Sequence, residues 1–214
     1  IPKVLVCCPT SDKKRYCDND YFSMIQSLSY PNYEIFICDN SVTTDYFLEI
    51  KNKRKLSVAH VNPKGKTAAQ FITESYNRIV KEAILRECYY IMIIESDVFP
   101  PASNIIQRLM YHQLPVVSAM YHIGHGAESR LLLQKLEHVS HDFVHVEDLR
   151  NGDDTLFVDG TVKEIFACGL GCVLIRADVF ARIPFKYQDG VNYFNDTFFY
   201  TDLFTAGIKN HVDT

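Results

Sequence analysis

The chain has 214 residues, of which 47% are hydrophobic, so it can form one domain with a full core. Its 26 acidic and 22 basic residues nearly balance, which gives no sign of a nucleic acid or an anionic membrane surface as a partner. No apolar run approaches the ~20 residues of a membrane-spanning helix, and no signal peptide is expected. The seven cysteines lie mostly in or beside apolar runs and form no pair of CxxC units, which predicts reduced, buried thiols and a cytoplasmic protein.

Strands and helices alternate along the first half of the sequence. Short apolar runs predict strands at residues 4–8, 34–38, 56–61 and 90–94. Apolar residues at helical spacing predict helices from about 19 onward, at 45–53, at 67–86 and at 102–112. This alternation is typical of βαβ units, whose strands are parallel.

The second half contains a segment of different character. Residues 122–160 are rich in His, Gly and charge, and we expect an insertion of loops and short strands there. His138, His141 and His145 could share a helical face and hold zinc, but the Val and Phe residues among them favour a strand with solvated histidines. The remaining predicted elements are strands at 116–121, 162–166, 172–175 and 208–212 and helices at 177–183 and 197–206.

Taken together, these elements predict an α/β fold. We expect a single domain over residues 1–214 with a Rossmann-like, mostly parallel central sheet and helices on both of its faces. In open sheets of this kind, ligands bind outside the carboxyl ends of the strands. We therefore expect the functional residues at those strand ends.

The stretch at residues 90–101, YIMIIESDVFPP, carries the first candidate site. Its five leading apolar or aromatic residues predict a strand buried on both faces, and the strand ends at Glu95, Ser96 and Asp97. Two carboxylates at positions i and i+2 offer the hard oxygen ligands that suit Mg²⁺ or Mn²⁺, and these ions hold phosphates. The structural alternative is an acidic turn that binds nothing.

Several other nucleotide and hydrolase folds are excluded by their missing motifs. The first strand is not followed by GxGxxG, and no GxxxxGK[ST] loop occurs, since KGKT at 64–67 lacks the first glycine. No GxSxG sequence is present. Cys7 and Cys8 lie within an apolar strand, which favours a core role over that of a nucleophile.

Six segments, in a fixed order, carry a family resemblance. They are VLVCCPT at 4–10, YPNYEIFICDNS at 30–41, NPKGKTAAQFITESYNRIV at 62–80, ESDVFPP at 95–101, FACGLGCVLIRADVFARI at 166–183 and FNDTFFYTDLFTAGIKNHVDT at 194–214. In this order they resemble the nucleotide-diphospho-sugar glycosyltransferases of the A-type fold, and family 2 in particular. The resemblance covers nearly the whole chain except roughly residues 122–160, which would then be an insertion on the acceptor side.

The resemblance implies a reaction and a set of site residues. It implies a glycosyltransferase that uses Mn²⁺ or Mg²⁺ to transfer a sugar from a UDP-sugar donor to an acceptor hydroxyl. The metal ligands would be Asp97 and Glu95, and the general base would be Asp196. The donor-binding residues would be Pro9, Thr10, Asp39, Asn40, Lys66, Asn77, Glu95 and Ser96. The acceptor side would include Gly169, Leu170 and Gly171.

The sequence departs from the family pattern at several positions. Glu95 stands where the family has the first Asp of its metal motif. Asn195 replaces the first acid of the pair before the last helix, and counting back from Gly207 puts Asp196, not Asp202, at the family's catalytic position. For the His that the family places after its final strand, the candidates here are His125, His211 or a water molecule.

Each predicted role also has a structural alternative. Asp196 could be the N-cap of the last helix rather than a base. Asp39 could form a turn rather than accept a hydrogen bond from the nucleobase. Lys64 and Lys66 could belong to a solvated loop rather than approach the diphosphate.

Two alternative functions remain open from the sequence. The chain could be a glycosyltransferase-like module that binds nucleotide or sugar without activity. This alternative is motivated by Asn195, which replaces an acid, and by the lack of the metal-binding His that the family places after its final strand. A sugar nucleotidyltransferase is the third possibility, although PTSDKKRY after the first strand has basic residues but no glycine. If Asp196 acts on the face opposite the leaving group, transfer inverts the anomeric carbon. The acceptor could be a saccharide, a small metabolite, a protein or a modified nucleic acid.

Overall fold

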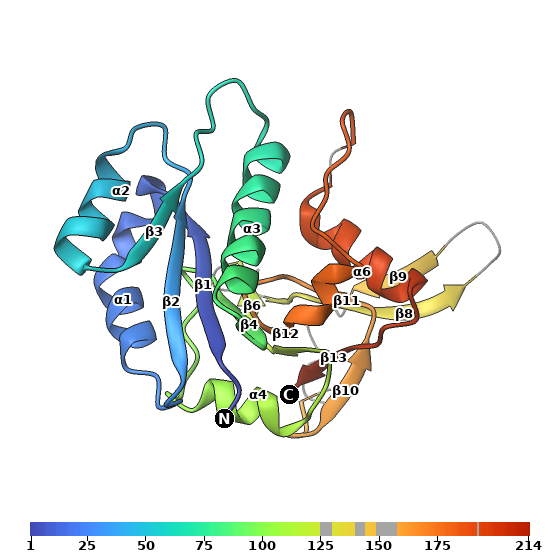
Figure 1. Ribbon diagram of the computed structural model, residues 1–214. Coiled ribbons are helices and arrows are strands. Elements are labelled where there is room, and N and C mark those ends of the chain that lie inside the picture. Colours follow the sequence, from blue (N-terminus) through green and yellow to red (C-terminus); the bar gives the residue numbers. More distant parts are fainter. Residues whose placement is uncertain (125–129, 140–143, 149–157, 192) are drawn as a thin grey trace.

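The computed structural model describes residues 1–124, 130–139, 144–148, 158–191 and 193–214. A central sheet of eight strands runs through the molecule (Figure 1). In spatial order, its strands are β10 (Val162–Ile165), β13 (Asn210–Asp213), β5 (Val116–Ala119), β12 (Cys172–Arg176), β4 (Tyr90–Ile94), β1 (Val4–Thr10), β2 (Tyr33–Asp39) and β3 (Ser57–His60).

Most strands of this sheet run in one direction. β1 pairs in parallel with β2 and β4, β2 pairs in parallel with β3, and β5 pairs in parallel with β13. β12 runs antiparallel to both β4 and β5, and β10 runs antiparallel to β13. The sheet is therefore mixed but mostly parallel, which confirms the predicted α/β class.

Helices cover both faces of the sheet (Figure 1). The α-helices are α1 (Asp18–Gln26), α2 (Asp45–Glu49), α3 (Ala68–Leu85), α4 (Ile105–Tyr111) and α6 (Asn195–Thr205). The remaining helical turns are η1 (Asp12–Cys17), η2 (Ile50–Arg54) and η4 (Ala177–Ala181).

The core divides into two layers because successive strand residues point to opposite faces. Leu5 of β1 and Ile93 of β4 pack with side chains of α3 and α6. Val6 and Met92, from the same strands, pack with side chains of α1, α2 and α4. All five residues of β4 are buried, as the sequence predicted for a strand covered on both faces.

Several helix boundaries differ from those expected. The segment predicted as a helix at 177–183 is the short 3₁₀ turn η4. The predicted helix at 45–53 is divided into α2 and the wider turn η2, which is followed at the C-cap position by Lys55 in the left-handed region with φ 58°. α3 begins as expected, since Thr67 and Gln70 form a reciprocal capping box.

The segment expected to be an insertion, residues 122–160, contains short strands in the parts that the structure describes. They are β6 (His122–Ile123), β7 (Arg130–Leu131), β8 (Leu133–Val139) and β9 (Val144–Asp148), and β8 also pairs with β11 (Ala167–Cys168). His138 and His145 are paired positions of β8 and β9, so the helical arrangement considered for a zinc site is wrong. His141 lies outside the described residues.

The cysteines are free and buried, as predicted. Burial raises the pKa of Cys38 to about 12 and that of Cys172 to about 12, so these thiols remain protonated at neutral pH. Within the described parts of the chain, no helix combines the length and the apolarity needed to cross a lipid bilayer.

The carboxyl ends of the parallel strands bring distant parts of the chain to one edge of the sheet. β1, β2 and β4 end there, and β12 begins there because Cys172 pairs with Ile94. Glu95, which follows β4, donates its N–H to the carbonyl oxygen of Gly171 over 2.8 Å. The segments after β2 and β4 thus share an edge, as the sequence predicted.

Candidate functional site

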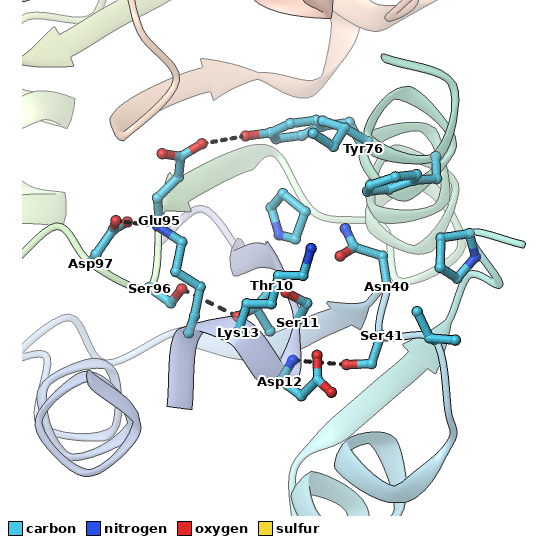
Figure 2. Close-up of a pocket in the computed structure, with 16 residues that line it drawn as sticks. Thr10, Ser11, Asp12, Lys13, Asn40, Ser41, Tyr76, Glu95, Ser96 and Asp97 are labelled. Carbon is cyan, nitrogen blue, oxygen red and sulfur yellow. Dashed lines mark hydrogen bonds and ion pairs between the residues drawn. The ribbon is translucent and has the colours of Figure 1, made fainter. Parts of the chain in front are cut away.

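A cavity of about 400 Å³ opens at this edge (Figure 2). Its lining comes from the end of β1 and the turn after it, at residues 9–14, and from the segments that follow β2 and β4, at residues 40–42 and 95–97. Pro63 and side chains of α3, Tyr76 among them, complete it. The predicted donor-binding residues on this lining are Pro9, Thr10, Asn40, Glu95 and Ser96, and the predicted metal ligand Asp97 lies there too.

Hydrogen bonds join the three segments beneath the cavity. The Asn40 N–H donates to the Thr10 carbonyl oxygen over 2.8 Å. The hydroxyls of Thr10 and Ser96 lie 3.2 Å apart, which ties the end of β1 to the segment after β4. The Asp12 N–H donates to Ser41 Oγ over 2.8 Å. The cavity walls are therefore held together by their own polar groups before any ligand binds.

Asp39 lies below the lining rather than on it. Its carboxylate is fully buried, accepts hydrogen bonds from the Ser41 N–H and hydroxyl, and lies 2.7 Å from His60 Nδ1. The bond to the N–H two residues ahead is the turn-forming contact considered as its alternative role. A direct contact with a nucleobase requires this buried side chain to become accessible from the cavity.

Lys66 and Asn77 are not brought to the cavity lining. Lys66 forms an ion pair with Glu74 on α3. Asn77 Nδ2 donates to the Phe185 carbonyl oxygen over 2.9 Å, which fixes the chain that follows η4. In this structure Asn77 therefore holds the surroundings of the site, and Lys66 takes part in a partly exposed ion pair.

The two carboxylates after β4 have different surroundings. Tyr76 Oη donates to Glu95 Oε1 over 3.1 Å, and Figure 2 shows the Glu95 carboxyl pointing toward Tyr76 and away from Asp97. Burial raises the pKa of Glu95, and the negative charges of Asp97 and Asp196 act in the same direction. Asp97 instead forms an ion pair with Lys14 and accepts a hydrogen bond from Tyr16 Oη over 3.3 Å.

The described residues do not form a metal site made of protein side chains alone. No group of three or more His, Cys, Asp or Glu side chains among them is arranged to hold an ion. His125 lies outside the described residues, and His211 of β13 lies beside Pro115 and Arg176, at the opposite edge of the sheet. His211 is therefore not a ligand candidate at this cavity, and of the protein side chains considered Asp97 fits best.

Asp196 lies in the first turn of α6. The helix begins at Asn195 with Phe194 at the N-cap position, so the N-cap role considered for Asp196 is wrong. The Thr197 N–H donates to Asp196 Oδ1 over 2.7 Å. Burial nevertheless raises the pKa of Asp196, and its charge contributes to the raised pKa of Glu95. Asp196 thus lies within electrostatic range of Glu95 while remaining outside the cavity lining.

The glycine pair before β12 accommodates Tyr121. A Cβ atom on Gly169 would lie 1.9 Å from Tyr121 Oη, and one on Gly171 would lie 2.6 Å from the ring carbon Cζ. The Gly171 N–H donates to Tyr121 Oη over 3.1 Å. Leu170, between the two glycines, is buried in the core on the α3 and α6 face. The glycines are needed for this close approach, and Leu170 is a packing residue.

A Gly171→Ala variant is expected to be destabilised by about 1–3 kcal/mol, because Tyr121 must move from its present position. Urea unfolding measures this change. In a Tyr121→Leu background, the same substitution should cost less, which is the coupling that a double-mutant cycle detects. An equal cost in both backgrounds would show that Tyr121 is not the neighbour that requires glycine.

The sequence did not single out several residues at or beside the site, among them Lys13, Lys14, Tyr76 and Tyr121. The two lysines could have been found from the sequence, because DKKR at 12–15 closely follows a strand that ends at the ligand-binding edge of the sheet. The tyrosines could not, because an aromatic residue on an apolar helix face or beside a strand usually indicates core packing.

The fold is shared with solved structures of low sequence identity. TarS from S. aureus has a TM-score of 0.60 at 14% identity, over 99% of this chain and 34% of that chain. TarS 1–349 in complex with UDP-GlcNAc has a TM-score of 0.58 at 14% identity, over 99% of this chain and 55% of that chain. A197 from STIV has a TM-score of 0.50 at 11% identity, over 98% of this chain and 81% of that chain. No protein-family model and no curated protein sequence matches the chain.

At these identities the likeness is one of fold. It extends over nearly the whole chain, which spans 34% of the longer TarS chain and 55% of TarS 1–349. The mostly parallel sheet, flanked by helices, is an α/β fold and is consistent with the A-type glycosyltransferase fold that the sequence resemblance implied.

Proposed function

We propose that the chain is a glycosyltransferase domain that transfers a sugar from a nucleotide-diphosphate donor, preferably a UDP-sugar, to an acceptor hydroxyl. The observation that carries this proposal is the cavity of about 400 Å³ at the carboxyl edge of the sheet, with Asp97 on its lining. Open α/β sheets bind ligands at this edge, and the volume is that of a small-molecule site. TarS, which shares the fold, has been solved with UDP-GlcNAc.

In this proposal the donor nucleoside lies against Pro9, Thr10 and Asn40, and its diphosphate extends toward Ser96 and Asp97. All five residues line the cavity. A direct contact between Asp39 and the base would follow only if its buried carboxylate became accessible from the cavity. Lys66 would have to leave Glu74 before it could reach a phosphate.

A Mn²⁺ or Mg²⁺ ion would be held by Asp97 together with the donor diphosphate. Ions of this kind often use only one or two carboxylates and complete their coordination with phosphates and water. A single partly exposed carboxylate fits such a shared site, with its side chain 35% exposed. When bound, the ion neutralises the charge that develops on the leaving diphosphate. Glu95 fits less well because Tyr76 donates to its carboxyl.

Asp196 is proposed as the general base. Its carboxylate would take the proton of the acceptor hydroxyl while the acceptor oxygen forms a bond to the anomeric carbon and the bond to the diphosphate breaks. The raised pKa makes it a stronger base than an ordinary aspartate. Attack from the face opposite the diphosphate inverts the anomeric carbon. Gly169, Gly171 and Tyr121 would border the acceptor.

An inactive binding module is the alternative that specific observations favour. Asn195 takes the place of an acid, and Asp97 is paired with Lys14. Such a module would bind the nucleotide sugar but release no nucleoside diphosphate. Activity and binding therefore have to be measured separately.

UDP with Mn²⁺ is expected to raise the melting temperature by about 5 °C or more at saturation, since a ligand at 100 times its Kd stabilises by about 2.7 kcal/mol. A thermal-shift panel of UDP, GDP, ADP and uridine, each with Mn²⁺, Mg²⁺ or EDTA, measures the effect. Uridine, which lacks the diphosphate, should give a smaller shift than UDP. If no nucleoside diphosphate shifts the transition, the proposed donor site is wrong.

A further inference from the structure

The chain that follows β1 presents two lysines to the cavity. Lys13 and Lys14 both belong to its lining, within η1. Lys14 pairs with Oδ2 of Asp97, the same oxygen that accepts from Tyr16 Oη over 3.3 Å. The carboxylate proposed for the metal therefore already has a positive charge beside it, supplied by the protein.

The ion pair between Lys14 and Asp97 can break at little cost to the stability of the fold. The Lys14 side chain is 39% exposed and that of Asp97 is 35% exposed, so water screens their attraction. A pair of this kind contributes little to stability. A lysine carries its charge on a flexible four-carbon stem, so its ammonium group can move without the backbone.

The backbone beneath Lys14 is fixed in place. The Lys14 N–H donates to the Ser11 carbonyl oxygen over 2.9 Å, and the buried Cys17 thiol donates to the Lys14 carbonyl oxygen over 2.9 Å. The start of the same turn is attached to the segment that follows β2, because the Asp12 N–H donates to Ser41 Oγ. The main chain therefore keeps Lys14 at the cavity, whichever partner its side chain has.

We propose that Lys14 is a diphosphate-binding residue that exchanges between two partners. In the ligand-free protein it neutralises Asp97, and in the donor complex it binds the diphosphate and leaves Asp97 to a divalent cation. This inference rests on the proposed function, because the diphosphate is that of the donor. A lysine is well suited to the role, since it binds phosphate as a point charge. Lys14 thus competes with the metal for Asp97 and cooperates with it at the phosphates.

A Lys14→Met variant is expected to change two affinities in opposite directions. Without nucleotide, it should bind Mn²⁺ roughly two- to fivefold more tightly, because Asp97 has lost its competing cation. In EDTA, it should bind UDP about tenfold more weakly or worse, because a charged hydrogen bond to the phosphates is missing. Isothermal titration measures both affinities without any turnover. Lys14→Arg, which keeps the charge, should bind UDP nearly as the wild type does.

Lys53→Met is the matched control. Lys53 pairs with Glu49 over 3.3 Å on the surface, with its side chain 75% exposed, and neither residue lines the cavity. This variant should leave both affinities unchanged. If the wild type binds UDP but Lys14→Met alters neither affinity, Lys14 is only a surface ion pair and the inference is overturned while the proposed function stands. If the wild type binds no UDP, both fail.

Discussion

An Asp97→Asn variant is expected to lose metal-dependent binding of UDP and, with it, most of its turnover. The amide is a poor ligand for a divalent cation, and a bound metal contributes several kcal/mol to the stabilisation of a leaving diphosphate. Turnover should therefore fall by about 10²-fold or more. Titration of UDP with Mn²⁺ and in EDTA separates the two effects. Binding in EDTA should persist, because Lys14 is then free to bind the phosphates.

Glu49→Gln is a suitable control for this experiment. Glu49 also forms an ion pair, with Arg15, but it does not line the cavity. The control should retain metal-dependent UDP binding and turnover. If Asp97→Asn behaves like the control, Asp97 is part of an acidic turn and not of a metal site, which is the alternative that the sequence left open.

An Asp196→Asn variant should leave UDP binding nearly intact and lower turnover by about 10²–10⁴, which is the usual contribution of general-base catalysis. Its stability at neutral pH should not fall. Because the pKa of Asp196 is raised in the folded state, its ionised carboxylate costs stability as the pH rises through the unfolded and then the folded pKa. The Asn side chain removes that cost and can still accept from the Thr197 N–H.

The pH dependence of transfer provides a second readout of the same residue. A base must be ionised, so turnover of the wild type should decline as the pH falls through the raised pKa of Asp196, above the ordinary Asp value of 3.8. The residual activity of Asp196→Asn should lack this acidic limb. Glu95 also has a raised pKa, so the profile of Glu95→Gln is needed for comparison.

Asp202→Asn is the matched control on the same helix. Asp202 forms an ion pair with Lys186 over 2.7 Å and does not line the cavity. It should transfer sugar at the wild-type rate. Equal loss of donor binding and turnover in Asp97→Asn and Asp196→Asn would mean that Asp196 belongs to the donor site. Unchanged turnover in Asp196→Asn would mean that it is a structural residue.

Much of the fold could be predicted because the parallel strands are buried on both faces. The apolar run at 90–94 predicted a strand that is covered on both faces of the sheet, as observed. Because parallel strands end at the same edge of a sheet, the segments that follow them were expected to meet there. The position of the cavity followed from that reasoning. Helix ends were less predictable, since α6 begins at Asn195 with no side-chain cap to indicate its start.

The partners of the site residues could not be predicted, because tertiary contacts decide them. Glu95 and Asp97 are two positions apart, yet Glu95 accepts a hydrogen bond from Tyr76 of α3, whereas Asp97 forms an ion pair with Lys14 of η1. The spacing suggested a shared ion, whereas the structure separates the two carboxylates. Asp39 likewise follows a strand at the expected edge, but its carboxylate is buried against His60. Residue type and strand position were therefore not enough to assign contacts.

The measurement that tests the central claim most directly is the release of UDP from UDP-GlcNAc by the purified protein in the presence of Mn²⁺. An enzyme in which Asp97 and Asp196 act as proposed should release UDP by slow transfer of the sugar to water, and each of their Asn variants should reduce that release. Lys53→Met should not. Binding of UDP-GlcNAc with no release of UDP, by the wild type and the variants alike, would contradict the account and indicate a glycosyltransferase-like binding module.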